Sequence, residues 1–257
     1  MNILIIGMGH MGAWFAEELH TNHSIAIFDT DEKKRTHGLH GTIINNLEEV
    51  TSFNPQMVIN AVDFTHTLSS FYTLFPYLSS DCILADIASV KTGLQDFYTL
   101  HKKRFVSVHP MFGPISAYVS DLLREHAIII KESDPDGKKF FIDFFSQKNV
   151  GIHEFTFREH DETIAYSLST PFITSMIFAA CMTRQQAPGS TFQKHLETAR
   201  GLLCEDNHLI SEILFNPLTQ TQINRMSDQL NVLSDIIARK DIDAMNQLIT
   251  KIRSKVE

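Results

Sequence analysis

The 257-residue sequence predicts an α/β fold in two parts, a mainly parallel sheet flanked by helices and then an all-helical domain. In the first part, short apolar runs alternate with helical patterns, which is typical of right-handed βαβ units. From about residue 157 the strand pattern ends, and apolar residues recur at helical spacing. We therefore expect the first domain at 1–156 and the second at 157–257.

Eight strands are expected in the first domain, each a short apolar run bounded by turn residues. They are Asn2–Ile6, Ser24–Phe28, Ile43–Ile44, Met57–Ala61, Cys82–Asp86, Phe105–Val108, His126–Lys131 and Gly151–Phe155. A helix over Ala13–Leu19 is expected to join the first two strands. Asp134-Pro-Asp-Gly137 predicts a turn, and the last helix of this domain is expected after it, at Lys138–Gln147.

The second domain shows apolar residues at helical spacing over Ile164–Ala180, Leu196–Leu203 and Leu230–Ile237, and 240–257 is predicted to form a final amphipathic helix. Pro171 is expected to kink the first of these helices, because proline removes a backbone donor and clashes with the preceding turn. That helix is apolar on most sides, which favours burial in a bundle or dimer core. We therefore expect a homodimer.

Composition excludes several classes of protein. The formal charge of −8 argues against nucleic-acid and membrane-surface binding, since both need a basic surface. Cys82, Cys181 and Cys204 are odd in number and far apart, so we expect no disulfide and a reducing, cytoplasmic setting. The longest apolar run, Pro171–Met182, is too short to span a bilayer. The 13 histidines show no metal-ligand spacing, so no metal is expected.

A glycine-rich segment lies between the first strand and the first helix. Its residues, Gly7-Met-Gly9-His-Met11-Gly12, match the pattern GxGxxG. In this pattern the first glycine allows a tight turn, the second lets a pyrophosphate approach the backbone, and the third lets helix and strand pack closely. The following helix N-terminus offers unpaired N–H groups to phosphate. We predict a Rossmann-type dinucleotide-binding domain, with Met11 also beside the cofactor.

Asp29, at the end of the second strand, predicts which dinucleotide is bound. Its carboxylate is suited to accept hydrogen bonds from ribose hydroxyls and to repel a 2′-phosphate, so we expect NAD rather than NADP. Two alternatives stay open. Asp29 instead caps a helix, or Lys33, Lys34 and Arg35 turn back toward the ribose and weaken the preference. We expect those three residues to form a solvated helix face.

Two further segments follow predicted strands, where ligands of such sheets are bound. They are Asp86-Ile-Ala-Ser89-Val-Lys91 and Ser107-Val-His109-Pro-Met-Phe-Gly113-Pro114. A histidine at a strand end, in a loop stiffened by two prolines, is suited to accept a proton near neutral pH.

At these segments the sequence resembles the prephenate and arogenate dehydrogenase family of tyrosine biosynthesis. HPMFGP at 109–114 and D-x-x-S-V-K at 86–91 are similar to motifs of that family and follow the glycine segment in the same order. The pair His160-Asp161, at the start of the long helix, is similar as well. The resemblance covers the whole chain in layout, a Rossmann domain followed by a helical domain for dimerisation and substrate binding.

The resemblance implies an NAD-dependent oxidoreductase, in which His109 deprotonates the ring hydroxyl of prephenate as hydride passes to NAD and the ring carboxylate leaves as CO2. The other product would be 4-hydroxyphenylpyruvate. Ser89 is expected to form hydrogen bonds close to His109, the substrate hydroxyl and the nicotinamide. Its alternative role is that of a helix N-cap. Lys91 is expected to bring positive charge to the anionic substrate. His160 and Asp161 are expected to support the site without reacting.

One departure from the family concerns substrate binding. Many members carry an SHxPH-like segment on the long helix, and the matching stretch here, Leu168-Ser-Thr-Pro-Phe172, lacks both histidines. The family also clamps a substrate carboxylate with an arginine on a later helix. Arg200 is the first candidate, with Lys194 and His195 one to two turns before it. Each of these three also fits an exposed helix position.

Three other functions stay open. Arogenate dehydrogenase acts on a substrate that differs only in an amino group in place of the side-chain keto group. The altered 168–172 segment also leaves room for a dehydrogenase of another small hydroxy acid. The third is a non-catalytic NAD-binding protein that kept the fold. The joint presence of His109, Ser89 and Lys91 argues against it, because holding a dinucleotide requires none of them.

Overall fold

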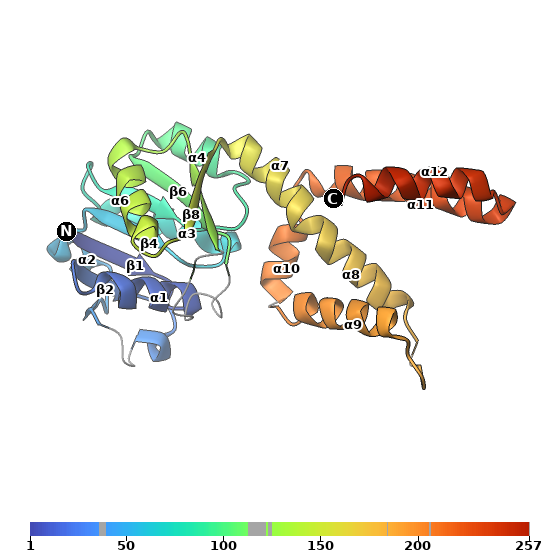
Figure 1. Ribbon diagram of the computed structural model, residues 1–257. Coiled ribbons are helices and arrows are strands. Elements are labelled where there is room, and N and C mark those ends of the chain that lie inside the picture. Colours follow the sequence, from blue (N-terminus) through green and yellow to red (C-terminus); the bar gives the residue numbers. More distant parts are fainter. Residues whose placement is uncertain (36–39, 113–121, 123–124, 184, 206, 257) are drawn as a thin grey trace. The chain divides into compact units, whose positions relative to one another are not determined.

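The computed structural model describes residues 1–35, 40–112, 122, 125–183, 185–205 and 207–256 (Figure 1). They form two compact units. The first contains Met1–Ile164 and Asp206–Ile213, and the second contains Ala165–Glu205 and Leu214–Glu257. The predicted fold class, a parallel-dominated α/β domain followed by a helical part, is confirmed.

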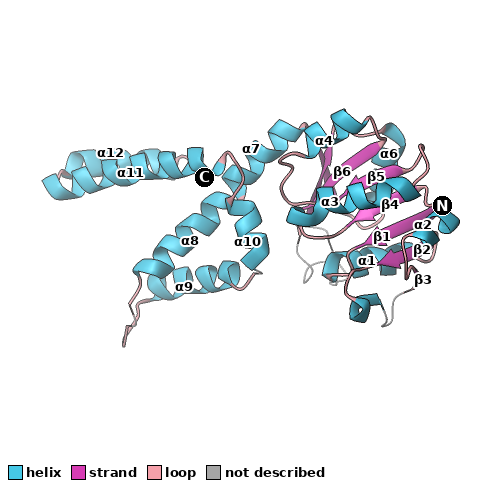
Figure 2. Cartoon of the chain, turned by 180° about the vertical axis from the view of Figure 1, so that it is seen from behind, coloured by secondary structure: helices cyan, strands magenta, loops and turns pink. Residues whose placement is uncertain are grey.

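The first unit is built on a sheet with the strand order β3-β2-β1-β4-β5-β6-β7-β8, of which Figure 2 labels the strands from β3 to β6. The strands are β1 Asn2–Ile6, β2 Ser24–Phe28, β3 Thr42–Ile43, β4 Met57–Asn60, β5 Ile83–Asp86, β6 Phe105–Pro110, β7 His126–Ile130 and β8 Gly151–Phe155. Neighbouring strands pair in parallel except β6 with β7, which are antiparallel. Every predicted strand is present, with small shifts at the ends. The largest shift is at β6, whose last residues pair with β7.

The helical elements that lie wholly or mostly in this unit connect its strands, except α7 and α10, which follow β8. They are α1 His10–Leu19, η1 Glu32–Arg35, α2 Glu48–Phe53, α3 Phe64–Leu74, η2 Phe75–Tyr77, α4 Leu94–His101, α6 Pro135–Ser146, α7 Phe157–Ser167 and α10 Asn207–Leu214. The predicted division of the chain at 156–157 falls at the start of α7, whereas the first compact unit extends to Ile164 and also takes in Asp206–Ile213. The domain boundary therefore stays a prediction.

Both faces of the sheet are covered, because alternate residues of each strand point to opposite sides. In β1, Ile3 and Ile5 belong to the core that α1 and α6 cover, while Leu4 and Ile6 belong to the core that α3 and α4 cover. A strand buried on both faces is apolar throughout, which explains the continuous apolar run at the start of the sequence.

The start of α6 differs from the sequence prediction. Asp134 is the N-cap, and its carboxylate accepts hydrogen bonds from the N–H groups of Asp136 and Gly137. Pro135 is the first helical residue, a position where proline is favoured because no intrahelical donor is needed. The predicted turn is therefore the first turn of the helix, which begins before the expected Lys138.

The second unit is helical and contains α8 Ser169–Cys181, α9 Ser190–Leu203, α11 Thr219–Arg239 and α12 Ile242–Arg253. α8 packs against α9 and α11, and α11 packs against α12. α7 ends at Ser167, whose carbonyl loses its usual donor because Pro171 has no N–H. The expected break is therefore present, at Leu168. Large apolar side chains on the surface of this unit include Met176, Ile177, Leu230, Ile237, Ile242 and Ile252.

The stretch Phe157–Cys181 consists of α7, Leu168 and α8. By length and composition alone, it is long and apolar enough to cross a membrane. This stretch is longer than the apolar run Pro171–Met182 that the sequence predicts to be too short to span a bilayer. Phe157, His160 and Ile164 are buried within the first unit. Packing inside that unit accounts for these three side chains, whereas the most apolar part of the stretch is α8.

Candidate active site

The glycines after β1 meet three different steric demands. Gly7 has a φ of +83°, which favours glycine. At Gly12 a Cβ atom would lie 1.9 Å from the carbonyl oxygen of Gly7, so only glycine lets α1 pack this closely on the loop. Nothing lies within 4 Å of the corresponding point at Gly9, which leaves its backbone open to approach. Met11 is partly buried and packs against the core under α1.

Asp29 is tied to the glycine loop. Its Oδ2 accepts a hydrogen bond from the Met8 N–H at 2.6 Å, and its Oδ1 accepts one from the Asp31 N–H at 2.8 Å. Asp31, rather than Asp29, bonds the start of η1, since its Oδ1 accepts from the Lys33 N–H at 3.0 Å. The helix-cap alternative for Asp29 is therefore wrong. Each Asp29 oxygen keeps a further lone pair with which to accept from a ligand hydroxyl.

A cavity of about 390 Å³ lies at the carboxyl ends of β1, β2 and β4. Gly7, Gly9 and Asp29 line one part of it, and Asp63 and His66 at the start of α3 line another. The strand order reverses between β1 and β4, with β2 on one side and β5 on the other. Open α/β sheets bind their ligands at such a reversal.

The three basic residues after Asp29 do not form one solvated face. Arg35 is buried, its guanidinium lies 4.8 Å from the centre of the Phe28 ring, and its Nε donates to the Asp29 carbonyl oxygen. Lys34 lines the cavity, and Lys33 is exposed. The prediction was wrong for Arg35 because its long side chain folds back over β2.

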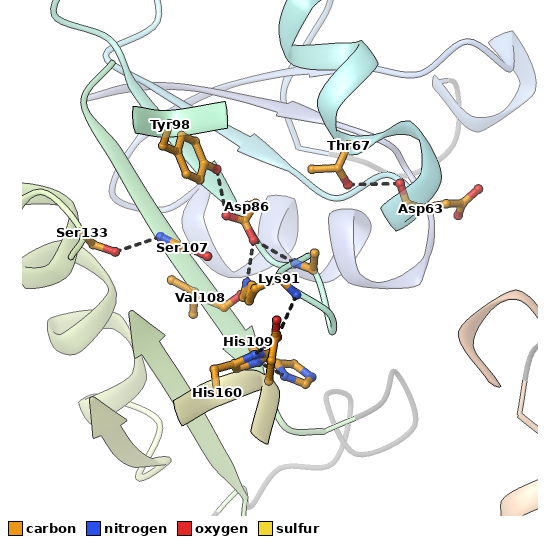
Figure 3. Close-up of polar contacts among 12 residues, drawn as sticks. Asp63, Thr67, Asp86, Lys91, Tyr98, Ser107, Val108, His109, Ser133 and His160 are labelled. Atoms are coloured by element: carbon orange, nitrogen blue, oxygen red, sulfur yellow. Dashed lines mark hydrogen bonds and ion pairs between the residues drawn. The ribbon is translucent and has the colours of Figure 1, made fainter. Parts of the chain in front are cut away.

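A second polar centre lies at the end of β6 (Figure 3). His109 is 4% exposed, and its Nδ1 lies 2.9 Å from Nε2 of His160 on α7. Nδ1 of His160 lies 2.9 Å from Oδ1 of Asp161. The same oxygen accepts a hydrogen bond from the backbone N–H of Lys91 at 3.2 Å. The segments at 86–91, 107–110 and 160–161 thus meet at one point.

Asp86 and Lys91 form an ion pair beside His109, with both side chains 0% exposed. Lys91 Nζ lies 2.6 Å from Asp86 Oδ1 and 2.8 Å from the carbonyl oxygen of Val108. The Tyr98 hydroxyl donates to the other Asp86 oxygen at 2.8 Å. Lys91 therefore points into the interior, where Asp86 and the Val108 carbonyl hold its ammonium. Its expected role, to bring positive charge to the anionic substrate, stays a prediction.

Burial sets the protonation of the centre. It lowers the pKa of His109 well below 6.5, and the positive charge that His160 carries when protonated and the ammonium of Lys91 lower it further. It also lowers the pKa of His160 well below 6.5, again helped by Lys91. Burial raises the pKa of Asp161, while the N–H and charge of Lys91 oppose that rise. Both imidazoles are therefore neutral at neutral pH, and a neutral imidazole can accept a proton.

Ser89 lies between β5 and α4 and is half-buried. Gly93 is the N-cap of α4, so the N-cap alternative for Ser89 is wrong. Gly113 and Pro114, the end of the expected loop, lie outside the described residues.

The three basic residues expected to bind the substrate carboxylate lie on α9 in the second unit, and all are exposed. Lys194 and His195 line a cavity of about 360 Å³ between α8 and α9. The His195 ring lies 5.8 Å from the Phe178 ring, and Arg200 lies one turn further along α9. Their contact with a substrate stays a prediction.

Sequence reasoning missed two members of the His109 centre. The sequence predicts no role for Asp86 beyond its place in the D-x-x-S-V-K motif, and it predicts none for Tyr98. The available signal was a charged residue that ends an otherwise apolar strand, since such a group is buried only with a partner. Among the described residues, no three His, Cys, Asp or Glu side chains gather in a way that suits a metal ion.

Comparison with known proteins adds independent support. Residues 15–146 match the family model "Prephenate dehydrogenase, nucleotide-binding domain". The T-protein of Enterobacter agglomerans is 25% identical over 166 residues, which are 64% of this chain and 40% of that protein. The chain thus spans well under half of this relative's length.

Two solved structures show the same fold over nearly the entire chain. Prephenate dehydrogenase from A. aeolicus, in complex with hydroxyphenyl propionate and NAD+, has a TM-score of 0.80 and 20% identity, with 100% of this chain and 98% of that chain covered. Synechocystis arogenate dehydrogenase has a TM-score of 0.78 and 16% identity, with 99% and 98% covered. The family model matches about half of the chain, on the domain that carries the glycine loop and His109, and the chain therefore belongs to the prephenate dehydrogenase family.

Proposed function

We propose that the protein is an NAD-dependent prephenate dehydrogenase, which converts prephenate to 4-hydroxyphenylpyruvate with release of CO2. The observation that carries this proposal is a neutral, buried His109 at the carboxyl end of β6, within the domain that holds the glycine loop. Membership of the family and a similar structure with NAD+ bound support it.

The chain's residues fit NAD. Gly9 leaves room for a pyrophosphate, the N-terminus of α1 follows at once, and Asp29 lines the same cavity. NAD supplies the acceptor for the hydride that leaves the ring carbon bearing the hydroxyl. The negative charge of Asp29 disfavours a 2′-phosphate. Lys34 lines the same cavity, so the preference is expected to be strong rather than absolute.

His109 has the proton-transfer role in this proposal. As the C–H bond breaks, the ring hydroxyl becomes a carbonyl and its proton passes to His109. The C–C bond to the carboxylate then breaks, CO2 leaves, and the electrons of that bond complete the aromatic ring. The ring oxygen takes the proton back from His109 and becomes the phenol of 4-hydroxyphenylpyruvate. A positioned base contributes typically about 10²- to 10⁴-fold to such a step. Ser89, between β5 and α4, is proposed to orient the hydroxyl beside His109.

The substrate's carboxylates need cationic partners, because a buried carboxylate without one is costly. We propose Arg200, Lys194 and His195 for this purpose, as exposed basic residues of α9. Lys91 is not proposed to touch the substrate, since its ammonium is held by Asp86 and Val108.

The test is NADH formation at 340 nm with prephenate and NAD, beside arogenate and NADP. We expect turnover with prephenate that falls by about 10²-fold or more in His109→Asn while NAD binding is kept. Faster turnover with arogenate would assign the protein to that substrate, which the likeness to the Synechocystis enzyme makes the second candidate. NAD binding without turnover of either would overturn the proposal and favour another hydroxy acid or a binding role.

We also propose that the protein acts as a cytoplasmic homodimer on a small-molecule substrate, without nucleic acid or membrane partners. The exposed apolar side chains of the second unit and the acidic net charge support this. A sedimentation measurement that gives a monomer at micromolar concentration would contradict the dimer.

A further inference from the structure

The contacts of His109 form a line of three side chains that reaches from β6 into α7. Nδ1 of His109 and Nε2 of His160 are 2.9 Å apart, and Nδ1 of His160 and Oδ1 of Asp161 are 2.9 Å apart. Each distance is that of a hydrogen bond. The three groups are therefore coupled through their protons, although the two histidines lie 51 residues apart in the sequence.

The Asp161 end fixes the direction of this line. Oδ1 of Asp161 receives the backbone N–H of Lys91 as well as the ring of His160, so it acts as an acceptor toward both. Nδ1 of His160 must then carry a hydrogen. A neutral His160 has its lone pair on Nε2, and that lone pair can only accept from His109. Nδ1 of His109 consequently carries its hydrogen, and Nε2 of His109 holds the free lone pair.

The surroundings keep both rings neutral. His160 is 0% exposed and His109 is 4% exposed, which disfavours a charged ring. The charged groups that face them are Asp86 at the end of β5, Lys91 from the segment after β5, and Asp161 from α7. The ammonium of Lys91 lowers the pKa of each histidine further.

We propose that His160 and Asp161 are positioning residues, which hold His109 in the Nδ1–H tautomer and so present Nε2 as the base. This inference rests on the proposed function for its catalytic meaning. The tautomer itself is independent of the substrate. Asp161 acts through His160, and His160 acts through His109, so neither needs to touch the substrate.

The first experiment is nitrogen NMR of the full chain labelled with ¹⁵N-histidine at pH 7.5, in which His109→Asn identifies the His109 signals. We expect a protonated Nδ1 and an unprotonated Nε2 in the wild type. In Asp161→Ala the acceptor is lost, and we expect His109 to populate both tautomers. A wild-type His109 protonated on Nε2 would overturn the proposal even if the enzyme turns over prephenate.

The second experiment compares turnover in three variants. His160→Leu removes both ring nitrogens, and kcat is expected to fall by about 10²-fold with KM nearly unchanged. His160→Gln offers an amide oxygen that can accept the His109 Nδ1–H, and we expect it to keep at least tenfold more activity than His160→Leu. Asp161→Ala is expected to fall between them.

The outcomes separate the two proposals. Equal losses of kcat in His160→Leu and His160→Gln, or an unchanged His109 tautomer in Asp161→Ala, would overturn the positioning role. If the wild type shows no dehydrogenase activity, the proposed function fails. The NMR measurement of the His109 tautomer still tests whether His160 and Asp161 position His109. If His160→Leu does not fold, Asp161→Ala and His160→Gln carry the test by NMR.

Discussion

The two polar regions of the first unit are built in opposite ways. The glycine loop leaves space, since nothing fills the place of a Cβ at Gly9 and a cavity opens beside Asp29. The centre around His109 is closed, with the side chains of Lys91 and His160 0% exposed. Phosphate charge can be met by backbone N–H groups, which any loop of the right shape provides. A proton-transfer group instead needs side chains that fix its protonation state.

The stability of the closed region around His109 should depend most strongly on the balance of its buried charges. Lys91→Met leaves Asp86 buried without its cation, and we expect the free energy of unfolding to fall by about 3–5 kcal/mol in chemical denaturation. The double variant Asp86→Asn/Lys91→Met removes both charges and keeps an acceptor for Tyr98. It should recover much of the loss. Lys139→Met breaks an exposed pair with Asp143 and should cost less than about 1 kcal/mol.

In the open region, stability should depend on Gly12, which packs against the loop, and not on Gly9, which faces the cavity. In Gly12→Ala the new Cβ meets the Gly7 carbonyl, and we expect a loss of about 3 kcal/mol in unfolding free energy. Gly9→Ala has free space, so stability should stay within about 0.5 kcal/mol while NAD binding weakens. Calorimetry and cofactor titration measure both effects. A stable Gly12→Ala variant would refute the packing argument.

The closed region should also make stability sensitive to acid. His109 and His160 have folded-state pKa values below 6.5, whereas in the unfolded chain they titrate near 6.5. Below pH 6.5 the unfolded chain binds protons that the folded chain does not. The stabilisation present above pH 6.5 is thus lost as the pH falls, by up to about 1.4 kcal/mol per pH unit for each histidine. Urea denaturation from pH 7.5 to 5.5 measures this slope, which should be shallower in His160→Gln.

The smallest expected effect concerns cofactor choice in the open region. Asp29→Asn removes the charge that repels a 2′-phosphate, and we expect the ratio of kcat/KM for NADP to that for NAD to rise about tenfold. Asp31→Asn is the matched control, because Asp31 is exposed and does not line the cavity. An equal change in both variants would point to general electrostatics rather than to contact with the ribose.

The same contrast explains what the sequence predicts well. Strands such as β1 and the spacing of Gly7, Gly9 and Gly12 are local patterns. Their positions can therefore be predicted from a few neighbouring residues of the sequence. The bond between His109 and His160 joins residues 51 positions apart, and it exists only because α7 packs at the end of β6. The burial of Lys91 likewise depends on the neighbouring strand β6, because the Val108 carbonyl oxygen accepts a hydrogen bond from the Lys91 ammonium. Arg35 was misjudged for a similar reason, since Phe28 offers it an aromatic surface.

The end of β5 has a consequence for how this family can vary. Asp86 makes the last pairing between β5 and β6, with Ser107, and the next carbonyl of β6, that of Val108, receives the Lys91 ammonium. A side chain thus completes the hydrogen bonding that one more residue of strand would otherwise supply. Because the same ammonium neutralises Asp86, a substitution at position 91 disturbs the sheet and the charge balance together. The residues at positions 86 and 91 should therefore covary among related proteins, so that they are replaced as a pair and not independently.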